Sequence, residues 1–585
     1  MAICPPKKID SNATGARYAK ERCLGELPAN PIWYALEPNS YSDFGGQITT
    51  VARNPINQSR QRKKGVVTDN EASGGLNQDI TQSNTTDLLQ GFVFADARER
   101  GTTNSLVRGQ SLLTAVDAAN SEYEFNNVAA VSATVGAAGT GYRVGDLLSY
   151  ATGAQSAARF YVSAINPATG AITAVAVDDP GLRGAAPANP VAVTGGSGTA
   201  ATLNVTWGDA QPAFMIGDVV LATGFAEAAN NGLKNVDAYT SGVLTVNEAL
   251  TAEAAPPADA KLVAVGHTFA AAGLSIVMNG KLPRLTSAGP IDLTDYDFIP
   301  GEWVYLDGFV NNEGFARISV ITATYIEFDK TDWLPAAEAG AGITVTLYYG
   351  TIIRNESDPA LIKRQTYQIE RTLGQDENGT MSEYLVGAVP NEFTLNVAQA
   401  DKVTVDMTFI AIDNEQRDGT QGVKAGARPP LVIEDAFNTS SDFSRIKLAS
   451  VDPLDPNPKP LFAFATDLSL TINNNVTANK AIGVLGAFDT SAGTFEVGGS
   501  ITAYFASIEA VRAVRNNADI TLDFIMVKNN AALLFDIPLL ALGNGRLAVE
   551  QDQAVTLPLD TSAAENKFGN TLTMQVFPYL PDSAG

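Results

Sequence analysis

The sequence predicts a mainly β protein, built from antiparallel sheets with one dry face and one wet face and from a few short helices. Apolar and polar residues alternate strictly over 468–472 and again over 495–505. Such alternation sends successive side chains to opposite faces of a strand, as in a sheet with one buried face. The composition agrees, since Ala, Gly, Thr and Val abound while only 17% of the 585 residues are charged.

A unit of strand, long loop, strand and helix organises the C-terminal part. Its two strands are the two alternating runs, and the first of them ends in the polar turn 473–475. After the second strand the period changes from two to three, because Ile508, Val511 and Val514 recur at every third position. Ser507 precedes them as a predicted N-cap. The pattern predicts a short amphipathic helix behind the second strand.

The same unit is predicted a first time within residues 46–97. Ile48 aligns with Ile472, and Gly74 aligns with Gly498, both at an offset of 424 (472 − 48 and 498 − 74). This suggests an internal duplication, with two similar β lobes in one chain. The loop of the first copy gathers five basic residues: Arg53, Arg60, Arg62, Lys63 and Lys64. A charge run is usually a solvated face, but a basic loop is also suited to contact an acidic neighbour.

Shifts in composition divide the rest of the chain. The region 127–209 is rich in Ala, Gly, Val and Thr with few charges, which predicts an inserted β module. The run 214–225 matches 298–309 at a spacing of 84 residues, which predicts two repeated small β modules. The expected regions are an N-terminal arm (1–45), a first lobe (46–126), the inserted module (127–209), the repeated modules (210–340) and a second lobe (341–585).

Sequence motifs for catalysis, cofactors or metals are missing. His267 is the only histidine, which excludes a multi-histidine metal site, and we expect a structural role for it. A nucleotide-binding P-loop and a G-x-S-x-G elbow are both absent. The run 376–379 lacks the ligand spacing of a calcium loop, and Asp452 and Asp455 lie among prolines in a stiff connector. We predict no enzyme, no catalytic residue, no cofactor and no metal.

Charge and cysteine content limit the partners and the compartment. The formal net charge of −24 argues against tightly held nucleic acid, because phosphate binding needs clustered Lys and Arg. Acidity keeps a protein soluble, and it also suits a surface past which DNA slides without sticking. With only Cys4 and Cys23, the folding compartment is expected to be reducing. No signal-peptide pattern opens the chain, and no apolar run reaches the roughly 20 residues of a membrane span. We therefore expect synthesis in the cytoplasm and no membrane insertion.

Two stretches resemble a known family. The runs 468–475 and 495–505, with the helix behind them, are similar to the tail tube (major tail) proteins of long, flexible-tailed bacteriophages of the siphovirus type. The N-terminal runs 46–55, 74–79 and 88–91 are similar to the start of the same family. The resemblance implies lobes of β-sandwich or β-barrel type, each with a short helix. It also implies subunits that form stacked rings, and the rings build the hollow tube through which phage DNA passes to the host.

The resemblance also implies partners and a place. The chain would bind itself, and two lobes per chain favour a trimeric ring with pseudo-sixfold symmetry over a hexamer. A tape measure protein inside the tube, a terminator and a tail tip at its ends would be further partners. DNA would pass without sticking, and the basic loop would contact the next ring. The protein would be made in the cytoplasm of the bacterial host and end in the virion.

Three other readings remain. The first is another virion structural protein, such as a decoration, collar or tail-tip protein. The second is a secreted or surface adhesin, which would be expected to carry a signal peptide. The third is a carbohydrate-active tail enzyme, which would show short β-helical repeats or acidic pairs within aromatic clusters.

Overall fold

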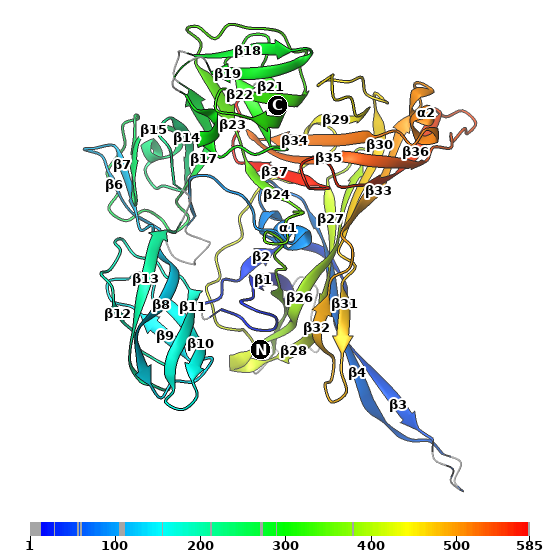
Figure 1. The fold of residues 1–585 in the computed structure, drawn as a ribbon. Helices are drawn as coiled ribbons and strands as arrows, with labels where there is room; N and C mark the ends of the chain where they lie inside the picture. Colours follow the sequence, from blue (N-terminus) through cyan, green and yellow to red (C-terminus); the bar gives the residue numbers. More distant parts are fainter. Residues whose placement is uncertain are drawn as a thin grey trace, which may run out of the picture. The chain divides into compact units, whose positions relative to one another are not determined.

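The computed structural model describes residues 13–582 except for 29, 55, 57, 59–60, 105–111, 155, 211–212, 270–272, 288, 290 and 377–378. Contacts divide the chain into two compact units: unit 1, of Met1–Arg98 and Ala271–Gly585, and unit 2, of Glu99–Ala270. The prediction of a mainly β protein is confirmed, because the described residues form 37 strands and two α-helices (Figure 1). None of the sheets that these residues form closes into a barrel.

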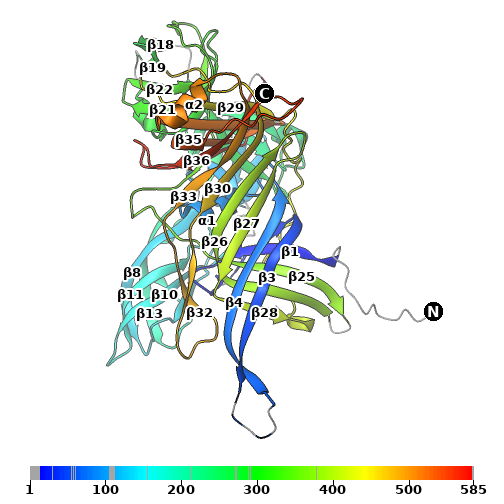
Figure 2. The same ribbon diagram turned by 90° about the vertical axis from the view of Figure 1, so that its right-hand side faces the viewer.

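Unit 1 is organised around one long antiparallel sheet (Figures 1 and 2). Eight of its strands lie side by side in the order β3 (Pro38–Arg53), β4 (Lys63–Asp79), β27 (Thr404–Ala411), β26 (Gly379–Ala398), β30 (Ala465–Asn473), β33 (Glu496–Tyr504), β36 (Thr556–Ala563) and β35 (Ala531–Asn544). The sheet joins segments that are far apart in the sequence, since β4 pairs with β27. The N-terminal part and the C-terminal half of the chain therefore share one layer.

Further strands extend from the two long strands β26 and β35. The first half of β26 pairs with β25 on one side and with β28 on the other, and the first half of β35 pairs with β34 and β37. These flanking strands and their continuations are β25 (Tyr367–Asp376), β1 (Gly15–Lys20), β2 (Tyr34–Leu36), β28 (Asp413–Arg417), β34 (Ile520–Lys528), β29 (Phe443–Ser450), β37 (Thr573–Phe577) and β24 (Thr351–Arg354). The second half of each long strand thus belongs to the eight-stranded layer. The first half belongs to an outer layer, which the flanking strands form.

Unit 1 contains two lobes with the same topology. The first runs β3, β4, α1 (Thr86–Val93), β25, β26 and β27, and the second runs β30, β33, α2 (Glu509–Arg515), β34, β35 and β36. Their strands pair in matching orders, β3-β4-β27-β26-β25 and β30-β33-β36-β35-β34. In the second lobe the loop between the first two strands carries a small hairpin of β31 (Thr477–Lys480) and β32 (Ala487–Ser491). Each lobe therefore repeats the predicted unit of strand, loop, strand and helix.

The structural correspondence between the lobes differs from the offset of 424 expected from the sequence. It differs by one residue in β4 and β33. It differs by more in β3 and β30, where Ile48 is 50% exposed and Ile472 is buried, so these two residues do not correspond. Gly74 shares the face of the buried Leu76, whereas Gly498 shares the face of the half-exposed Ser500. A one-residue shift places every side chain of a strand on the opposite face. Placing Gly75 opposite Gly498 in the comparison, at an offset of 423 (498 − 75), restores matching faces.

The helix behind β33 is present where it was predicted, but its start and its buried face differ from the prediction. The N-cap is Ile508, although the Ser507 hydroxyl accepts a hydrogen bond from the Glu509 N–H at 3.3 Å. Ala510 and Ala513 are buried, while Ile508 is 55% exposed. The helix approaches its sheet closely through these small residues, which the three-residue pattern of larger side chains did not reveal.

A six-stranded module precedes the outer strands of unit 1. Its strand order is β18 (Leu274–Asn279), β19 (Leu282–Ser287), β22 (Tyr325–Thr331), β21 (Gly314–Ile321), β20 (Trp303–Asp307) and β23 (Val345–Tyr348). Buried ion pairs join it to the second lobe. Lys330 of β22 pairs with Asp523 of β34, and Arg317 of β21 pairs with Asp536 of β35 at 2.9 Å. Both aspartates are fully buried, so the module is held by charges that water cannot screen.

Unit 2 contains a sheet of the same strand order: β6 (Leu113–Asp117), β7 (Glu122–Phe125), β16 (Val243–Val246), β15 (Gly232–Thr240), β14 (Asp218–Thr223) and β17 (Lys261–Phe269), with β5 (Thr102–Asn104) beside β17. The two modules also share polar contacts. Asn230 donates to Glu253 at 3.0 Å, as Asn312 donates to Glu338 at 2.8 Å in unit 1. The repeat seen in the sequence is therefore a repeat of structure.

The rest of unit 2 follows β7 as a separate β module with its own core. One sheet consists of β12 (Val191–Ala192), β13 (Thr199–Asp209) and β8 (Val128–Thr140), and the other of β11 (Ala171–Asp179), β10 (Ala158–Asn166) and β9 (Leu147–Tyr150). The buried Arg183 lies over the rings of Tyr150 and Trp207, with centroid distances of 4.7 and 4.3 Å. Short 3₁₀ helices elsewhere in the chain cover Ala228–Asn230, Leu293–Tyr296 and Gly419–Gln421.

Candidate functional site: the polar face of the long sheet

The most distinctive surface of unit 1 is the long sheet, because six adjacent strands alternate between buried apolar and exposed polar side chains. In β30 the buried residues are Leu468, Leu470 and Ile472, and the same alternation runs through β4, β27, β26, β33 and β36. The dry face packs on α1, whose Phe92 ring lies 5.5 Å from that of Phe393 on β26. The alternation predicted over 468–472 and 495–505 is thus confirmed.

The opposite face carries hydroxyl, amide and carboxyl groups. The hydroxyls of Thr394 and Thr471 lie 3.2 Å apart across the boundary between the two lobes. Asn77 and Asn396 both donate to the carboxylate of Asp406, at 2.9 and 2.7 Å. These contacts tie side chains of neighbouring strands together on the wet side. Because every strand contributes, the face is a continuous polar surface and not a single pocket.

Acidic residues dominate the charge of this polar face. Eight carboxylates lie on it: Asp69, Glu71, Asp79, Glu392, Asp406, Asp467, Glu496 and Asp560, of which Asp79 pairs with Lys402. Lys480 of the β31–β32 hairpin pairs with both Asp69 and Glu71. Its hydrogen bond lowers the pKa of Asp69 below the usual value. The remaining carboxylates give the face an excess of negative charge, which repels phosphate groups.

The eight-stranded layer ends in two strand edges that have no partner among the described residues. β3 pairs with β4 alone, and the segment 541–544 of β35 pairs with β36 alone. In the first lobe the corresponding part of β26 pairs on its other side with β30. Unpaired strand edges are templates for pairing with another chain. Each molecule of this protein therefore offers one such edge at either side of the layer.

The basic residues predicted to form a contact loop lie at the end of the β3–β4 hairpin. Arg53, Arg62, Lys63 and Lys64 are all exposed there, and Arg60 lies outside the described residues. The hairpin extends well beyond the rest of the sheet (Figures 1 and 2). The sequence indicated this basic cluster, but it did not reveal the length of the hairpin that carries it.

None of the groups considered for chemistry belongs to the strands of this face. His267 is buried in unit 2, where its Nδ1 lies 2.9 Å from the Asp218 carboxylate. Asp455 pairs with Lys281 at 2.8 Å, and the Asp452 carboxylate accepts the Leu454 N–H. Asp455 thus forms an ion pair and Asp452 a local turn hydrogen bond, as expected for residues of a connecting segment. The side chains of 376–378 lie outside the described residues.

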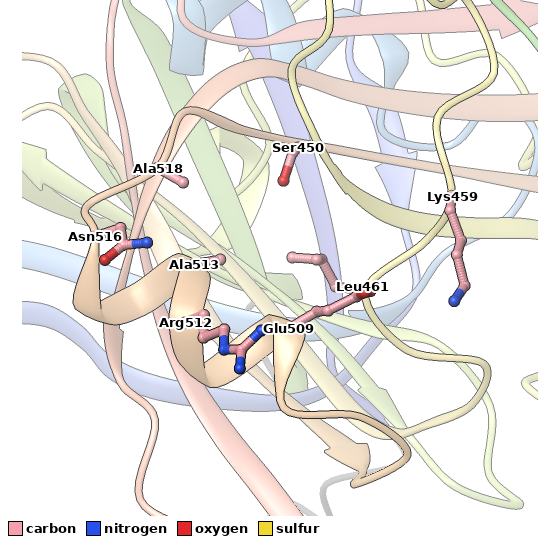
Figure 3. Close-up of a pocket in the computed structure, with 8 residues that line it drawn as sticks. All are labelled: Ser450, Lys459, Leu461, Glu509, Arg512, Ala513, Asn516 and Ala518. Atoms are coloured by element: carbon pink, nitrogen blue, oxygen red, sulfur yellow. The ribbon is translucent and has the colours of Figure 1, made fainter.

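Two features that the sequence analysis did not single out are a pocket and an acidic group. The pocket, of 310 Å³, lies beside α2 (Figure 3) and is lined by Ser450, Lys459, Leu461, Glu509, Arg512, Ala513, Asn516 and Ala518. No histidine or cysteine is among these residues. In unit 2, carboxylate oxygens of Asp117, Glu122 and Glu124 lie within 4.8 Å of one another. The Asp117 carboxylate already accepts hydrogen bonds from the Ala119 N–H and from Asn120.

Comparison with known proteins agrees with the architecture of unit 1. Residues 322–563 match the family described as phage tail tube protein. This match supports a phage tail tube protein. The matched segment contains the whole second lobe and the strands β25 to β27 of the first. The match supports a structural protein of a phage tail, and the family implies assembly with itself and with other tail proteins in general.

Other comparisons add less. No curated protein matches the tail tube chain. None of the described helices is long and apolar enough to cross a membrane. The strands β3 and β4, which carry the basic hairpin, lie outside the matched segment. The assignment of the family thus rests on the lobes, and the hairpin and unit 2 have to be argued from their own residues.

Proposed function

We propose that the chain is the subunit of a hollow tail tube, in which copies join edge to edge into rings and the rings stack around a channel for DNA. The observation that carries the proposal is the eight-stranded layer with one polar face and two unpaired edges. A sheet that ends in unpaired edges is completed when the edge of another copy joins it. Repeating that contact around an axis closes the ring and removes the edges.

The junction inside each chain provides the pattern for the junction between chains. Between the lobes, Thr394 of β26 lies opposite Thr471 of β30. Comparison of the lobes places Gly543 of β35 where Thr394 lies, because their partners Asp560 and Asp406 correspond. It places Ser42 of β3 where Thr471 lies, because both face the matched glycines of β4 and β33. We expect Ser42 of one copy to lie opposite Gly543 of the next.

Three copies per ring fit the duplication better than six. Each lobe contributes four strands to the layer, and each chain has two lobes. A trimer thus has six lobes and pseudo-sixfold symmetry, and the junctions between lobes and between chains alternate around the ring. The polar face would line the channel, where its carboxylates let polyanionic DNA pass without binding. The apolar face is covered by the helices and outer strands.

Further parts of the proposal follow from this role. The tube would belong to a long, flexible tail of the siphovirus type, with a tape measure protein inside and terminator and tail-tip proteins at its ends. The chain would be made in the bacterial cytoplasm and would act without catalysis or a cofactor. The basic hairpin of Arg53, Arg60, Arg62, Lys63 and Lys64 would contact the adjacent ring, where acidic groups attract it.

A disulfide between neighbours tests the ring directly. The variant Ser42→Cys/Gly543→Cys places one thiol on each edge of every copy. Residues directly opposite on antiparallel strands have Cα atoms about 4.5–5.5 Å apart, which suits a disulfide. Gly543 tolerates a side chain, since a Cβ there would meet no atom closer than 3.5 Å. After oxidation of the assembled protein, denaturing electrophoresis should show covalent species that end at three chains.

The controls separate the ring from chance contacts. With Cys4 and Cys23 replaced by serine in all variants, either single variant should give at most dimers. The double variant Ser40→Cys/Gly543→Cys keeps both thiols on the same face but two positions out of register, so its cross-linking should be much weaker. A ladder that ends at six chains would replace the trimer by a hexamer. Assembled protein that forms no Ser42–Gly543 cross-link at all would contradict the proposed edge contact.

A further inference from the structure

The pocket beside α2 gathers polar side chains that no other contact of the fold uses. Helix α2 forms one wall, and the connector that follows β29 (residues 451–464) forms the other (Figure 3). Four lining residues make no side-chain hydrogen bond or ion pair with any described residue: Ser450, Lys459, Arg512 and Asn516. A hydroxyl, an amide and two cationic groups therefore line one cavity with their hydrogen-bonding capacity unused.

The charge of the pocket is opposite to that of the chain as a whole. Lys459 and Arg512 contribute two positive charges and Glu509 contributes one negative charge, whereas the whole chain has a formal net charge of −24. An arginine side chain presents N–H donors in a fork that matches a carboxylate. Amide and hydroxyl groups can donate further hydrogen bonds to the same group. The polar wall therefore favours a ligand that carries an anionic group.

The inner surface of the pocket is apolar. Leu461 and Ala513 are each 8% exposed and line it together with Ala518. The pocket has a volume of 310 Å³, and an apolar cavity of about 150 Å³ is large enough to take up benzene. None of the lining residues is aromatic. The pocket therefore has room for a ring as well as for a charged group.

The first lobe shows what fills the same place beside its own helix. β1 pairs with β25 as β29 pairs with β34, and β2 pairs with β1 as Pro460 of the connector bridges Ala449 of β29. Tyr18 of β1 and Tyr34 of β2 have ring centroids 5.4 Å apart. Burial, and then the charge of Asp87 on α1, raises the pKa of both phenols, so the rings lie beside that helix. Two rings of the chain itself thus occupy in the first lobe the space that the second lobe leaves open.

We propose that the pocket beside α2 binds a small aromatic carboxylate. The ring of the ligand lies on the apolar inner surface, as the tyrosine rings lie beside α1, and Lys459 and Arg512 hold its carboxylate. The bound ligand joins α2 to the connector, so it stabilises the second lobe by mass action. This site is separate from the proposed ring contacts, because every residue that lines it belongs to one chain.

Binding of benzoate to the full-length chain before assembly tests the proposal. Ligand-observed NMR and calorimetry measure the affinity, and thermal unfolding measures the stabilisation. We expect benzoate to bind and to raise the unfolding midpoint. Acetate, which has no ring, and phenol, which has no charge, should bind roughly tenfold more weakly. Equal binding of acetate and benzoate would contradict the role of the apolar surface, and a chain that does not bind benzoate would overturn the site.

Substitutions in the pocket separate this site from non-specific binding. Lys459→Gln/Arg512→Gln removes both positive charges at exposed positions, so the chain should fold normally and bind benzoate roughly tenfold more weakly. Ala513→Leu fills the pocket from α2 and should abolish binding, with circular dichroism to check its fold. The control Arg515→Gln removes an exposed charge of the same helix outside the pocket and should bind as the wild type does. Unchanged affinity in the double variant, or an equal loss in Arg515→Gln, would overturn the inference whether or not rings form.

Discussion

At the scale of single residues, buried charges stabilise the attachment of the six-stranded module to the second lobe. Burial raises the pKa of Asp523, but attraction by Arg445 and Lys330 outweighs burial and holds that pKa well below its usual value. Removing one partner from a buried ion pair leaves an uncompensated charge and costs about 3–5 kcal/mol. The module and the lobe are therefore expected to unfold together.

Lys447 of β29 is an exception within this charged region, and it makes stability depend on pH. Burial, followed by repulsion from Arg445, lowers the pKa of Lys447 to about 8. The unfolded chain, with a lysine pKa near 10.4, binds more protons than the folded chain between pH 8 and 10.4. The charged lysine thus destabilises the fold below pH 8, and this penalty disappears as the pH rises through that window.

Lys447→Met is therefore expected to stabilise the protein at pH 7 by about 1–2 kcal/mol, after allowance for partial exposure and for the lost hydrogen bond to Asn457. The gain should shrink toward zero between pH 8 and 10. Thermal unfolding of both proteins across this range measures it. Lys281→Met removes an exposed lysine that pairs with Asp455, and it should show no such gain. A gain that stays constant with pH would contradict the assigned pKa.

At the scale of elements, local patterns in the sequence predicted the strands and helices, while pairing depended on distant residues. The alternation of apolar and polar residues around Leu470 predicted both the strand β30 and the face of it that is buried. The helix α2 was placed correctly, and the predicted Val511 and Val514 pack against the core, but its fully buried residues are Ala510 and Ala513, whose small side chains carry little periodic signal. No local pattern reveals that β4 lies beside β27, or that part of β35 has a free edge.

The register of the duplication shows why the candidate site was only partly predictable. In the first lobe the β3–β4 pairing shifts between Ser42 and Gly45, whereas no shift occurs between β30 and β33 beyond Asp467. An irregularity of this kind alters the spacing of side chains on one strand, so identical residues at one offset can lie on opposite faces. The polar face became visible only when the strands were placed side by side.

One glycine of this sheet allows the close approach of two neighbouring strands to be tested. Gly499 of β33 has a φ of +147°, and a Cβ there would lie 1.9 Å from the Ser469 carbonyl oxygen of β30. Gly499→Ala should therefore destabilise the second lobe by about 3 kcal/mol, through strain and a forced separation of the two strands. Gly543→Ala is the matched control, because its nearest atom is 3.5 Å away, and it should change stability by less than about 0.5 kcal/mol. Chemical denaturation compares the two, and equal losses would contradict this account.

At the scale of the whole molecule, the duplication, the free edges and the acidic face support a single account. In the proposed ring, two lobes in one chain would replace two separate subunits, so half of the lateral junctions would be intramolecular. The junction between β26 and β30 lies within the chain and forms on folding. The edges that remain unpaired are then those of β3 and β35. Assembly of the proposed ring would then need fewer encounters between chains, and a trimer would carry the segment 99–270 three times.

The negative charge of the polar face, which would line the proposed channel, gives a prediction that tests the whole assembly. Asp467, Glu496 and Asp560 are exposed on the polar face of the second lobe and make no salt bridge among the described residues. Replacing Glu496 and Asp560 with lysine should leave the strand edges and the β3–β4 hairpin unchanged, so tubes still form. Each added lysine that contacts a phosphate releases counterions, so duplex DNA should bind these tubes at low salt and leave them steeply as salt is raised. Co-sedimentation of tubes with short duplex DNA measures the effect, with wild-type tubes showing little binding at the same salt. Wild-type tubes that retain DNA as strongly as the variant would show that the acidic face does not serve to keep DNA from sticking.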